Sequence, residues 1–470
     1  MGVGSLINIL GGILKNKGIA LILGPSGIGL FGLFNSILYT AATITGMGLS
    51  SSGVRQIAEA QADGKGFKMA ATRRALTISS SAVGLVGALI LILFREHVAG
   101  LAMADEGHSR AVAWLGIGLW ATVASGSQTA LLNGLRRTAD LTWVNVIGAI
   151  VSLIVAVTGV WLWQADGVIA AVIAVPLSSL ATSWAFSRRL DTNKIRLSFH
   201  AIFQPLPKLF SLGLVFMLTA LMTVGTQFAI RVVVTRELGI DATGHFLAAW
   251  NISVLYLGFV LGAMGTDYYP RLTGVAKDMQ ASNTMMNEQA EVALLLSGPV
   301  ILAMLTLTPW IVALLYSQAF FDTNAVLKWQ ILGDIFKVAS WSLAFLFLAQ
   351  ARTVVFFLTE LAGNLVYIGC VWFGLPVWGL EATGIGFLIC YVFYFLLIWI
   401  LVRRMNGFLW SKSSLKLLAV LTLCSAFVFH LRASQSELLI PLGLLFTFSA
   451  GAYSFWRIST SFRTPRVKTP

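Results

Sequence analysis

The chain has 470 residues, of which 57% are hydrophobic and 11% charged, and its formal net charge is +13. An ordinary soluble domain is about a quarter charged and roughly 45–50% apolar, so this composition excludes a soluble domain, a disordered chain and a disulfide scaffold. It indicates instead an all-α, polytopic membrane protein whose helices satisfy their own backbone hydrogen bonds within the bilayer.

Apolar stretches long enough to cross the hydrocarbon core follow one another along the whole chain. The first six expected spans are residues 2–23, 27–50, 75–94, 110–132, 141–163 and 167–187. A second six are residues 208–230, 242–268, 291–315, 325–350, 353–375 and 380–402, and a last pair is 414–430 and 438–456. About fourteen spans of roughly 22 residues would place some 65% of the chain in lipid, which leaves no room for a soluble catalytic domain.

Basic residues concentrate in the segments that follow even-numbered spans. Of the 32 lysines and arginines, 22 lie in these segments or in the C-terminal tail, and five lie in or beside the segments that follow odd-numbered spans. Because basic residues accumulate in cytoplasmic loops, both termini are expected in the cytoplasm. Most of the net charge therefore records orientation and gives no sign of nucleic-acid binding.

The two halves of the chain align when Leu23 is placed on Leu238 and the positions that follow are kept in register. Other matches in the same register include Gly24 with Gly239, Gly29 with Gly244, Trp114 with Trp329, Trp163 with Trp378 and Trp184 with Trp399. This pattern predicts parallel repeats of six spans, as in transporters whose halves rock about a central site; an old duplication kept only for packing is the alternative. The expected division is residues 1–200 and 201–410 for two six-helix lobes, with 411–470 holding an additional helix pair and a tail.

Ionisable residues inside membrane spans are the first candidates for function, because each costs about 2.5–3.5 kcal/mol near the bilayer centre. They are Lys17 in the first span, Arg231 at the end of the seventh, Asp334 and Lys337 in the tenth, and Glu360 in the eleventh. Lys17 and Arg231 fit cavity cations or side chains that snorkel to the interface. Asp334 and Lys337, three residues apart, fit an intrahelical pair or a gating site. Glu360 fits a protonatable coupling site or a hydrogen bond to a neighbouring helix.

Other features of the spans carry weaker predictions. Asn35, Gln128, Asn145 and Asn251 are either cavity liners or interhelical contacts. Lys15 lies about 200° around the helix from Lys17 and is expected to point elsewhere. Residues 53–74 are amphipathic and basic, so they are expected along the cytoplasmic surface. The three cysteines lie in apolar stretches and the five histidines are scattered, so neither a disulfide framework nor a metal site is predicted.

Four segments of the chain resemble bacterial polysaccharide flippases. They are Ala20–Gly29 (ALILGPSGIG), Tyr269–Leu272 (YPRL), Trp329–Val338 (WQILGDIFKV) and Phe356–Glu360 (FFLTE). The sequence is similar to flippases for O-antigen and enterobacterial common antigen repeat units, within the multidrug/oligosaccharidyl-lipid/polysaccharide superfamily. The resemblance covers about residues 10–405.

This resemblance implies two six-helix lobes in a V around a central cavity, alternating access, and a polyprenyl-diphosphate-linked oligosaccharide as substrate. It implies a location in the bacterial inner membrane and similar residues at the positions of Lys17, Asp334, Lys337 and Glu360. No cofactor is expected; coupling to H⁺ or Na⁺ stays a hypothesis, as does partnership with a polysaccharide polymerase and a chain-length regulator.

Three other functions compete with a polysaccharide flippase. A drug/cation antiporter of the same fold would favour acidic over basic cavity residues. A peptidoglycan-precursor flippase is a second relative. A membrane-embedded glycan polymerase belongs to another class and is expected to carry sizeable external loops, whereas the longest such loop here, residues 95–109, holds no paired carboxylates across a cleft. The chain is therefore not expected to be an enzyme.

Overall fold

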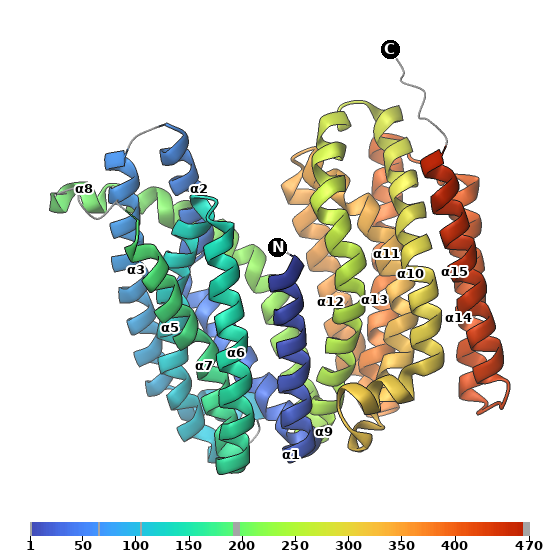
Figure 1. The fold of residues 1–470 in the computed structure, drawn as a ribbon, viewed down its shortest axis with the longest axis horizontal. Coiled ribbons are helices and arrows are strands. Elements are labelled where there is room, and N and C mark those ends of the chain that lie inside the picture. The colour runs from blue at the N-terminus through green and yellow to red at the C-terminus, as the bar shows by residue number, and fades with distance from the viewer. Residues whose placement is uncertain (1, 64–65, 104–105, 191–197, 464–470) are drawn as a thin grey trace. The chain divides into compact units, whose positions relative to one another are not determined.

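The computed structural model describes residues 2–63, 66–103, 106–190 and 198–463, in which the regular structure is helical (Figure 1). The first helices are α1 (Gly2–Gly46), α2 (Leu49–Ala62), α3 (Gly66–Leu93), α4 (Arg95–Met103), α5 (Ser109–Gly134), α6 (Thr138–Trp163), α7 (Gly167–Arg188) and α8 (Phe199–Phe203). They are followed by α9 (Leu206–Val275), α10 (Met279–Leu315), α11 (Thr323–Ala349), α12 (Thr353–Trp378), α13 (Glu381–Asn406), α14 (Lys412–Ala433) and α15 (Leu439–Arg463). Five of the basic residues counted above, Lys65, Lys194, Arg196, Arg466 and Lys468, lie outside the described residues.

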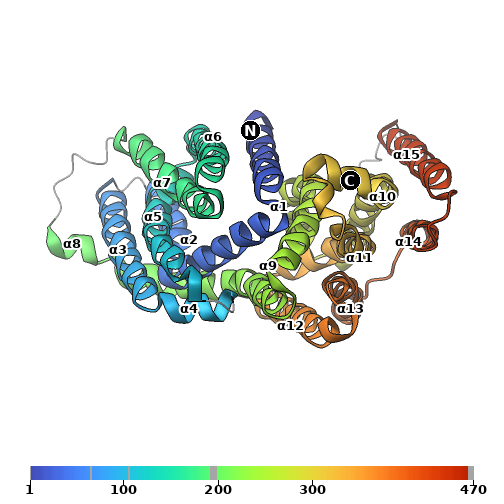
Figure 2. The ribbon, with the colours of Figure 1, turned by 90° about the horizontal axis from the view of Figure 1, so that it is seen from below.

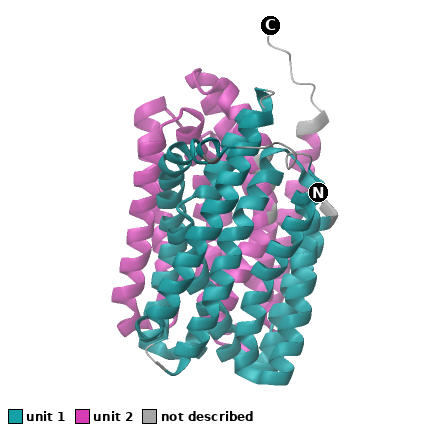
Figure 3. Cartoon of the chain, turned by 90° about the vertical axis from the view of Figure 1, so that its left-hand side faces the viewer, with its two compact units in different colours: residues 1–244, 315–319 teal, residues 245–314, 320–470 magenta. Residues whose placement is uncertain are grey.

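The chain forms two compact units, coloured separately in Figure 3. Unit 1 is Met1–Gly244 with Leu315–Ala319, and unit 2 is His245–Leu314 with Phe320–Pro470. In unit 1, α3 packs beside α5 and α6 beside α7; in unit 2, α13 packs against both α11 and α12 (Figure 2). These units are defined by contacts, whereas the expected lobes are defined by the sequence repeat. The expected lobe limits at residues 200 and 410 therefore remain a prediction.

The two longest helices each contain one non-helical glycine. In α1 this is Gly24 (φ 65°, ψ −155°), and in α9 it is Gly239 (φ 88°, ψ 175°). Positive φ costs glycine little, because it has no Cβ. Each kink lies at the boundary expected between two spans, at residues 24–26 and within residues 231–241, so α1 and α9 each consist of two helices that meet at this glycine. Divided at the kinks, the described chain contains the expected fourteen membrane-length helices.

The backbone repeats itself in the register found in the sequence. The kinks at Gly24 and Gly239 match in this register, and so do α6 and α12, which begin at Thr138 and Thr353 and are both 26 residues long. Before these helices, Arg136 and Ala351 share a φ of 55°; after them, Gln164 and Gly379 share a φ of 52°. A side chain in the left-handed region is uncommon, so its recurrence at matching positions confirms the predicted internal repeat of six helices.

The amphipathic stretch at 53–74 is divided between α2 and the first turns of α3. Leu49 and Ile57 of α2 are buried in a cluster with Leu76, Leu131 and Leu209 from α3, α5 and α9. The apolar face of α2 thus packs on protein. Burial against neighbouring helices removes this apolar area from water, and the position of residues 53–74 along the cytoplasmic surface remains a prediction.

The two additional helices are held to unit 2 by polar contacts with α10. Oε1 of Glu291 accepts hydrogen bonds from Nε of Arg457 on α15 and from Oγ of Ser413 on α14, both at 3.0 Å. Farther along α14, Nη1 of Arg432 donates to the carbonyl oxygen of Leu305 at 2.8 Å. One carboxylate on α10 therefore joins both helices of the pair.

Candidate functional site

A buried carboxylate in α11 forms the centre of a polar cluster inside unit 2. Asp334 is fully buried, and its Oδ2 accepts a hydrogen bond from Oγ of Ser253 at 2.9 Å and another from the Tyr256 hydroxyl, both on α9. Its other oxygen, Oδ1, has no hydrogen-bond partner among the described residues. An unused acceptor on a buried carboxylate is costly, so this oxygen is available for a proton or a cation.

Lys337 lies three residues after Asp334 but has contacts of its own. Its ammonium lies 5.5 Å from the ring centre of Phe387 and 5.2 Å from that of Tyr391, both on α13. Aromatic faces attract cations at such distances. The hydrogen bonds to Asp334 and the ring contacts of Lys337 come from two other helices, α9 and α13, so a direct ion pair between Asp334 and Lys337 remains a prediction.

Glu360, on α12, has the interhelical hydrogen bond that was one of its two expected roles. The hydroxyl of Tyr394 on α13 donates to its Oε1. Beside this pair, Sγ of Cys390 donates to the carbonyl oxygen of Gly363 at 3.2 Å. Since this bond satisfies only one oxygen, the contact by itself leaves a coupling role open to test.

A further polar group lies one helical turn before Asp334, on the same side of α11. The side chain of Gln330 is fully buried, and in the described chain neither its Oε1 nor its Nε2 has a hydrogen-bond partner. We call these residues, Ser253, Tyr256, Gln330, Asp334, Lys337, Glu360 and Tyr394, the unit-2 polar cluster. It combines two carboxylates and one ammonium with polar atoms of Gln330 and Asp334 that have no hydrogen-bond partner in the described chain.

In unit 1, Arg231 joins the first half of α9 to α1. Its Nη1 donates to the hydroxyl of Ser36 and, at 3.5 Å, to the carbonyl oxygen of Gly32. Its own carbonyl oxygen accepts from Oγ1 of Thr235 at 2.7 Å. Arg231 is half-buried, and its guanidinium points at α1 within the same unit. It therefore links α9 to α1, whether or not it also binds substrate.

The two lysines of α1 differ in their surroundings. Lys17 is half-buried. Lys15, which the sequence left without a role, places its ammonium 4.6 Å from the ring centre of Phe31 and lines a pocket of about 280 Å³ with residues of α6 and α7. The pocket also includes Asn145, one of the expected cavity liners.

The other three amides expected to line a cavity have different surroundings. Nδ2 of Asn35 donates to a carbonyl of its own helix, that of Phe31, at 2.7 Å. Nε2 of Gln128 on α5 lies 3.4 Å from Oγ1 of Thr77 on α3, which is the interhelical contact that was its alternative. Asn251, on α9, is exposed. Their assignment as substrate-binding residues therefore remains a prediction.

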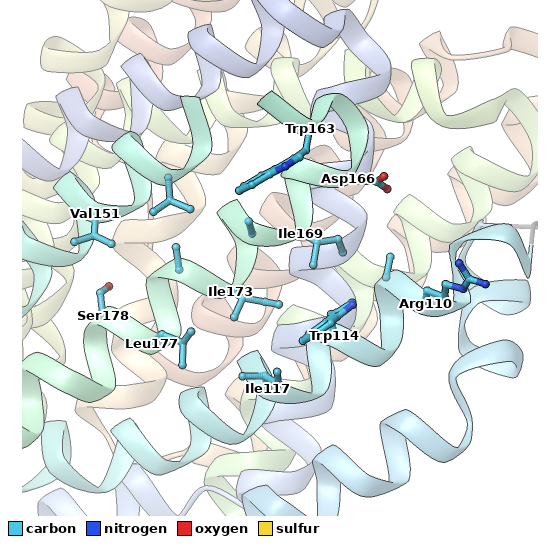
Figure 4. Close-up of a pocket in the computed structure, with 14 residues that line it drawn as sticks. Arg110, Trp114, Ile117, Val151, Trp163, Asp166, Ile169, Ile173, Leu177 and Ser178 are labelled. Atoms are coloured by element: carbon cyan, nitrogen blue, oxygen red, sulfur yellow. The ribbon is translucent and has the colours of Figure 1, made fainter. Parts of the chain in front are cut away.

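Unit 1 also carries a larger groove of about 1110 Å³ between α5, α6 and α7 (Figure 4). Figure 4 shows the rings of Trp114 and Trp163 over the apolar side chains of α7, with Arg110 and Asp166 at one end. Its body is mostly apolar, and no residue expected at the site lines it. The groove is therefore not part of the candidate site.

Sequence reasoning missed the partners of the charged groups. Ser253, Tyr256 and Tyr394 are common residues in membrane helices, and no local spacing marks them. Gln330 had a usable signal, because it lies four residues before Asp334 and thus on the same face of α11. Lys15 could have been found from its neighbour Lys17. Two lysines two residues apart on one span lie on different faces of the helix, so this helix has more than one polar face.

Comparison with known proteins identifies relatives of the whole chain. Residues 3–275 match the model of a family described as polysaccharide biosynthesis protein. The lipid III flippase of Escherichia coli (strain K12) is 22% identical over 434 residues, which cover 85% of this chain and 96% of that protein.

Two solved structures are similar in fold. The lipid II flippase MurJ in its inward closed conformation gives a TM-score of 0.75 at 16% identity, covering 98% of this chain and 99% of that one. An inward-facing multidrug resistance MATE family transporter gives 0.71 at 15% identity, covering 85% and 96%. The chain therefore has the fold of the MOP superfamily, to which the latter belongs.

Proposed function

Because the chain belongs to the family of polysaccharide biosynthesis proteins, we propose that it is a flippase for polyprenyl-diphosphate-linked oligosaccharide repeat units. It moves them from the cytoplasmic to the periplasmic leaflet of the bacterial inner membrane for an O-antigen-like surface polysaccharide. The observation that carries this proposal is the set of cations on membrane helices of unit 1, Lys15, Lys17 and Arg231, because an anionic headgroup requires such partners.

The physical task is to carry an anionic, sugar-bearing headgroup across hydrocarbon while its lipid tail stays in the bilayer. Lys17 and Arg231 replace water around the diphosphate, and Asn35, Gln128 and Asn251 offer hydrogen bonds to the sugars. Alternating access by the two repeats moves the headgroup between leaflets. With both termini cytoplasmic, an inside-negative potential favours export, because two negative charges gain about 4–5 kcal/mol per 100 mV.

The unit-2 polar cluster is assigned to gating or ion coupling. Among the described residues Oδ1 of Asp334 has no hydrogen-bond partner, and Oε1 of Glu360 accepts from Tyr394; each carboxylate can take up a proton or contribute to a Na⁺ site. Lys337 lies between aromatic rings of α13 and provides the positive charge that competes with the ion for these carboxylates.

A peptidoglycan-precursor flippase is the second candidate. It is favoured by the similarity in fold to the lipid II flippase MurJ, which extends over 98% of this chain. The cations of unit 1 argue against a drug/cation antiporter. A glycan polymerase is less favoured because the relatives are named as flippases and transporters. A polymerase and a chain-length regulator are proposed partners of the polysaccharide flippase only.

The deciding experiment measures which leaflet holds the lipid-linked repeat unit in cells that lack this protein. We expect accumulation in the cytoplasmic leaflet and rescue by the wild-type chain. Full translocation without polymer would contradict the proposal and favour the polymerase, whereas accumulation of a peptidoglycan precursor would favour the second candidate. A Lys17→Ala/Arg231→Ala double variant should fail to rescue, while Lys277→Ala, at the surface loop after α9, should rescue fully.

A further inference from the structure

The pocket beside Lys15 lies wholly within unit 1, between α1, α6 and α7, and has a volume of about 280 Å³. Small residues open it: Gly11 and Gly12 on α1 face Gly148 and Ala149 on α6. A Cβ added to Gly12 would meet no atom within 4 Å, so this position borders open space. We call this space the Lys15 pocket.

The polar lining of the Lys15 pocket combines one cationic side chain with uncharged amides and hydroxyls. It consists of the ammonium of Lys15, the amides of Asn8 and Asn145 and the hydroxyls of Ser152 and Ser179. No carboxylate is among its lining residues, all of which belong to the described chain. A pocket of this kind attracts anions and repels cations, and its amides and hydroxyls can pair with the hydroxyls of a sugar.

Two of these groups lack the partners that a buried polar group normally has. Ser152 is only 3% exposed, yet its Oγ has no hydrogen-bond partner among the described residues. The ammonium of Lys15 rests on the ring of Phe31 and, in the described structure, donates to no carbonyl, hydroxyl or carboxylate. Because buried polar groups are almost always hydrogen-bonded, the Ser152 hydroxyl points to a ligand in the pocket, and the half-buried ammonium of Lys15 is placed to pair with an anionic part of that ligand.

We propose that the Lys15 pocket binds a phosphate ester of a polyhydroxylated group, with the phosphate on Lys15 and the hydroxyls on Asn8, Asn145, Ser152 and Ser179. A volume of about 280 Å³ lies at the lower end of ligand pockets. It fits one sugar ring with its phosphate and excludes a whole oligosaccharide. The inference rests on the proposed function: this ligand is the first sugar and adjoining phosphate of the lipid-linked substrate, held by Lys15 at a different stage of transport from its contact with Lys17 and Arg231.

The same chemistry has a second source in the membrane, because phosphatidylglycerol also joins a phosphate to two hydroxyls. The experiment therefore uses the full chain in nanodiscs of zwitterionic lipid and titrates two probes separately. One is a polyprenyl-diphosphate-linked N-acetylhexosamine, and the other is phosphatidylglycerol. Dissociation constants are read by native mass spectrometry.

Two variants alter the pocket in different ways. Gly12→Leu adds a bulky side chain to the pocket lining at a position where an added Cβ meets no atom within 4 Å, and Lys15→Met removes the charge while keeping a long unbranched side chain. We expect each to weaken binding of the sugar-bearing probe by about 10-fold or more, since hydrogen bonds to charged groups are the strong ones. Gly369→Leu is the matched control, because its added Cβ also meets nothing within 4 Å and it lies on α12.

The outcomes separate the pocket from the proposed function. Unchanged binding of the sugar-bearing probe by both variants, with wild-type translocation intact, would overturn the Lys15 pocket and leave the flippase standing. If the two variants lose binding of phosphatidylglycerol but keep binding of the sugar-bearing probe, the assignment of the pocket to the transported substrate is overturned. Loss of sugar-probe binding in a chain whose wild type translocates nothing would support the pocket and overturn the flippase.

Discussion

Gly29 of α1 and Gly244 of α9 meet at a helix crossing so close that neither position has room for a side chain. A Cβ at Gly29 would lie 2.3 Å from the carbonyl oxygen of Ile240 and 3.2 Å from the amide nitrogen of Gly244. A Cβ at Gly244 would lie 2.0 Å from the carbonyl oxygen of Pro25. The two glycines match in the register of the repeat, and each lies shortly after its kink glycine, so equivalent positions of the repeat contact each other.

This crossing should not tolerate even one methyl group. Gly244→Ala forces the two backbones apart, and we expect a loss of about 1–3 kcal/mol of stability, as for overpacked cores. Thermal unfolding of the purified chain in detergent measures it. Gly369→Ala, where an added Cβ meets nothing within 4 Å, should unfold within a degree or two of the wild type; equal melting of both variants would show that the crossing is not rigid.

Proton coupling, if present, should depend on Glu360. Glu360→Gln keeps the shape and can still accept from Tyr394 but cannot ionise, so we expect the pH dependence of transport to flatten while folding is retained. Transport assayed across a range of pH in proteoliposomes measures this. Glu381→Gln is the control, because that carboxylate pairs with Lys328 at 3.1 Å and is not part of the unit-2 polar cluster. An unchanged pH profile in Glu360→Gln would remove the coupling role.

The spans were predictable because hydropathy and the alternation of basic loops are local signals. Residues 353–375 were expected as a span, and α12 runs Thr353–Trp378. What hydropathy could not show is how two successive spans are joined. At Gly24 and Gly239 a single glycine with non-helical φ and ψ separates two helices that follow each other directly, and that conformation depends on the packing of the neighbouring helices.

The site was predictable in its charges but not in their partners. Asp334 and Lys337 stood out because charges in lipid are costly, yet their contacts come from Tyr256 on α9 and Tyr391 on α13, far away in the sequence. The helical wheel showed that Lys15 and Lys17 face different ways. It could not show that the face of Lys15 meets small residues of α6, because that depends on tertiary packing.

The ion pair between α2 and α9 should give a small, pH-dependent contribution to stability. Oε2 of Glu59 accepts from Nζ of Lys208 at 2.7 Å and Oε1 from Nε of Arg55 at 3.0 Å. The hydrogen bond from Lys208, then that from Arg55, holds the pKa of Glu59 below its ordinary value of 4.5. A lowered pKa means that the contribution is complete above the ordinary value and disappears as the pH falls through the lower, folded-state value.

Glu59→Gln should therefore cost about 0.2–1 kcal/mol at neutral pH, the usual range for exposed pairs, and nothing once the pH is below the folded-state pKa. Melting temperatures of variant and wild type at neutral and acidic pH measure this. High salt should shrink the difference at neutral pH because it screens exposed charges. A difference that grows on acidification would contradict the sign argued from the pKa.

The additional helix pair should detach when its shared carboxylate is removed. Glu291 accepts from Ser413 on α14 and Arg457 on α15, so Glu291→Ala deprives both helices of one partner. We expect a loss of about 1.5–3 kcal/mol, as for hydrogen bonds to charged groups, together with faster proteolysis at residues 407–411. Glu437→Ala, at an exposed carboxylate before α15, should change neither the stability nor the rate of proteolysis.

A double-mutant cycle tests the ion pair between Glu291 and Arg457 directly. We expect the Glu291→Arg/Arg457→Glu exchange to recover part of the loss and to show a coupling of about 0.5–3 kcal/mol. Additive effects would mean that α14 and α15 are held by contacts other than this ion pair, such as the hydrogen bond from Arg432 to Leu305 and the close packing of Gly443 of α15 against Thr306 of α10.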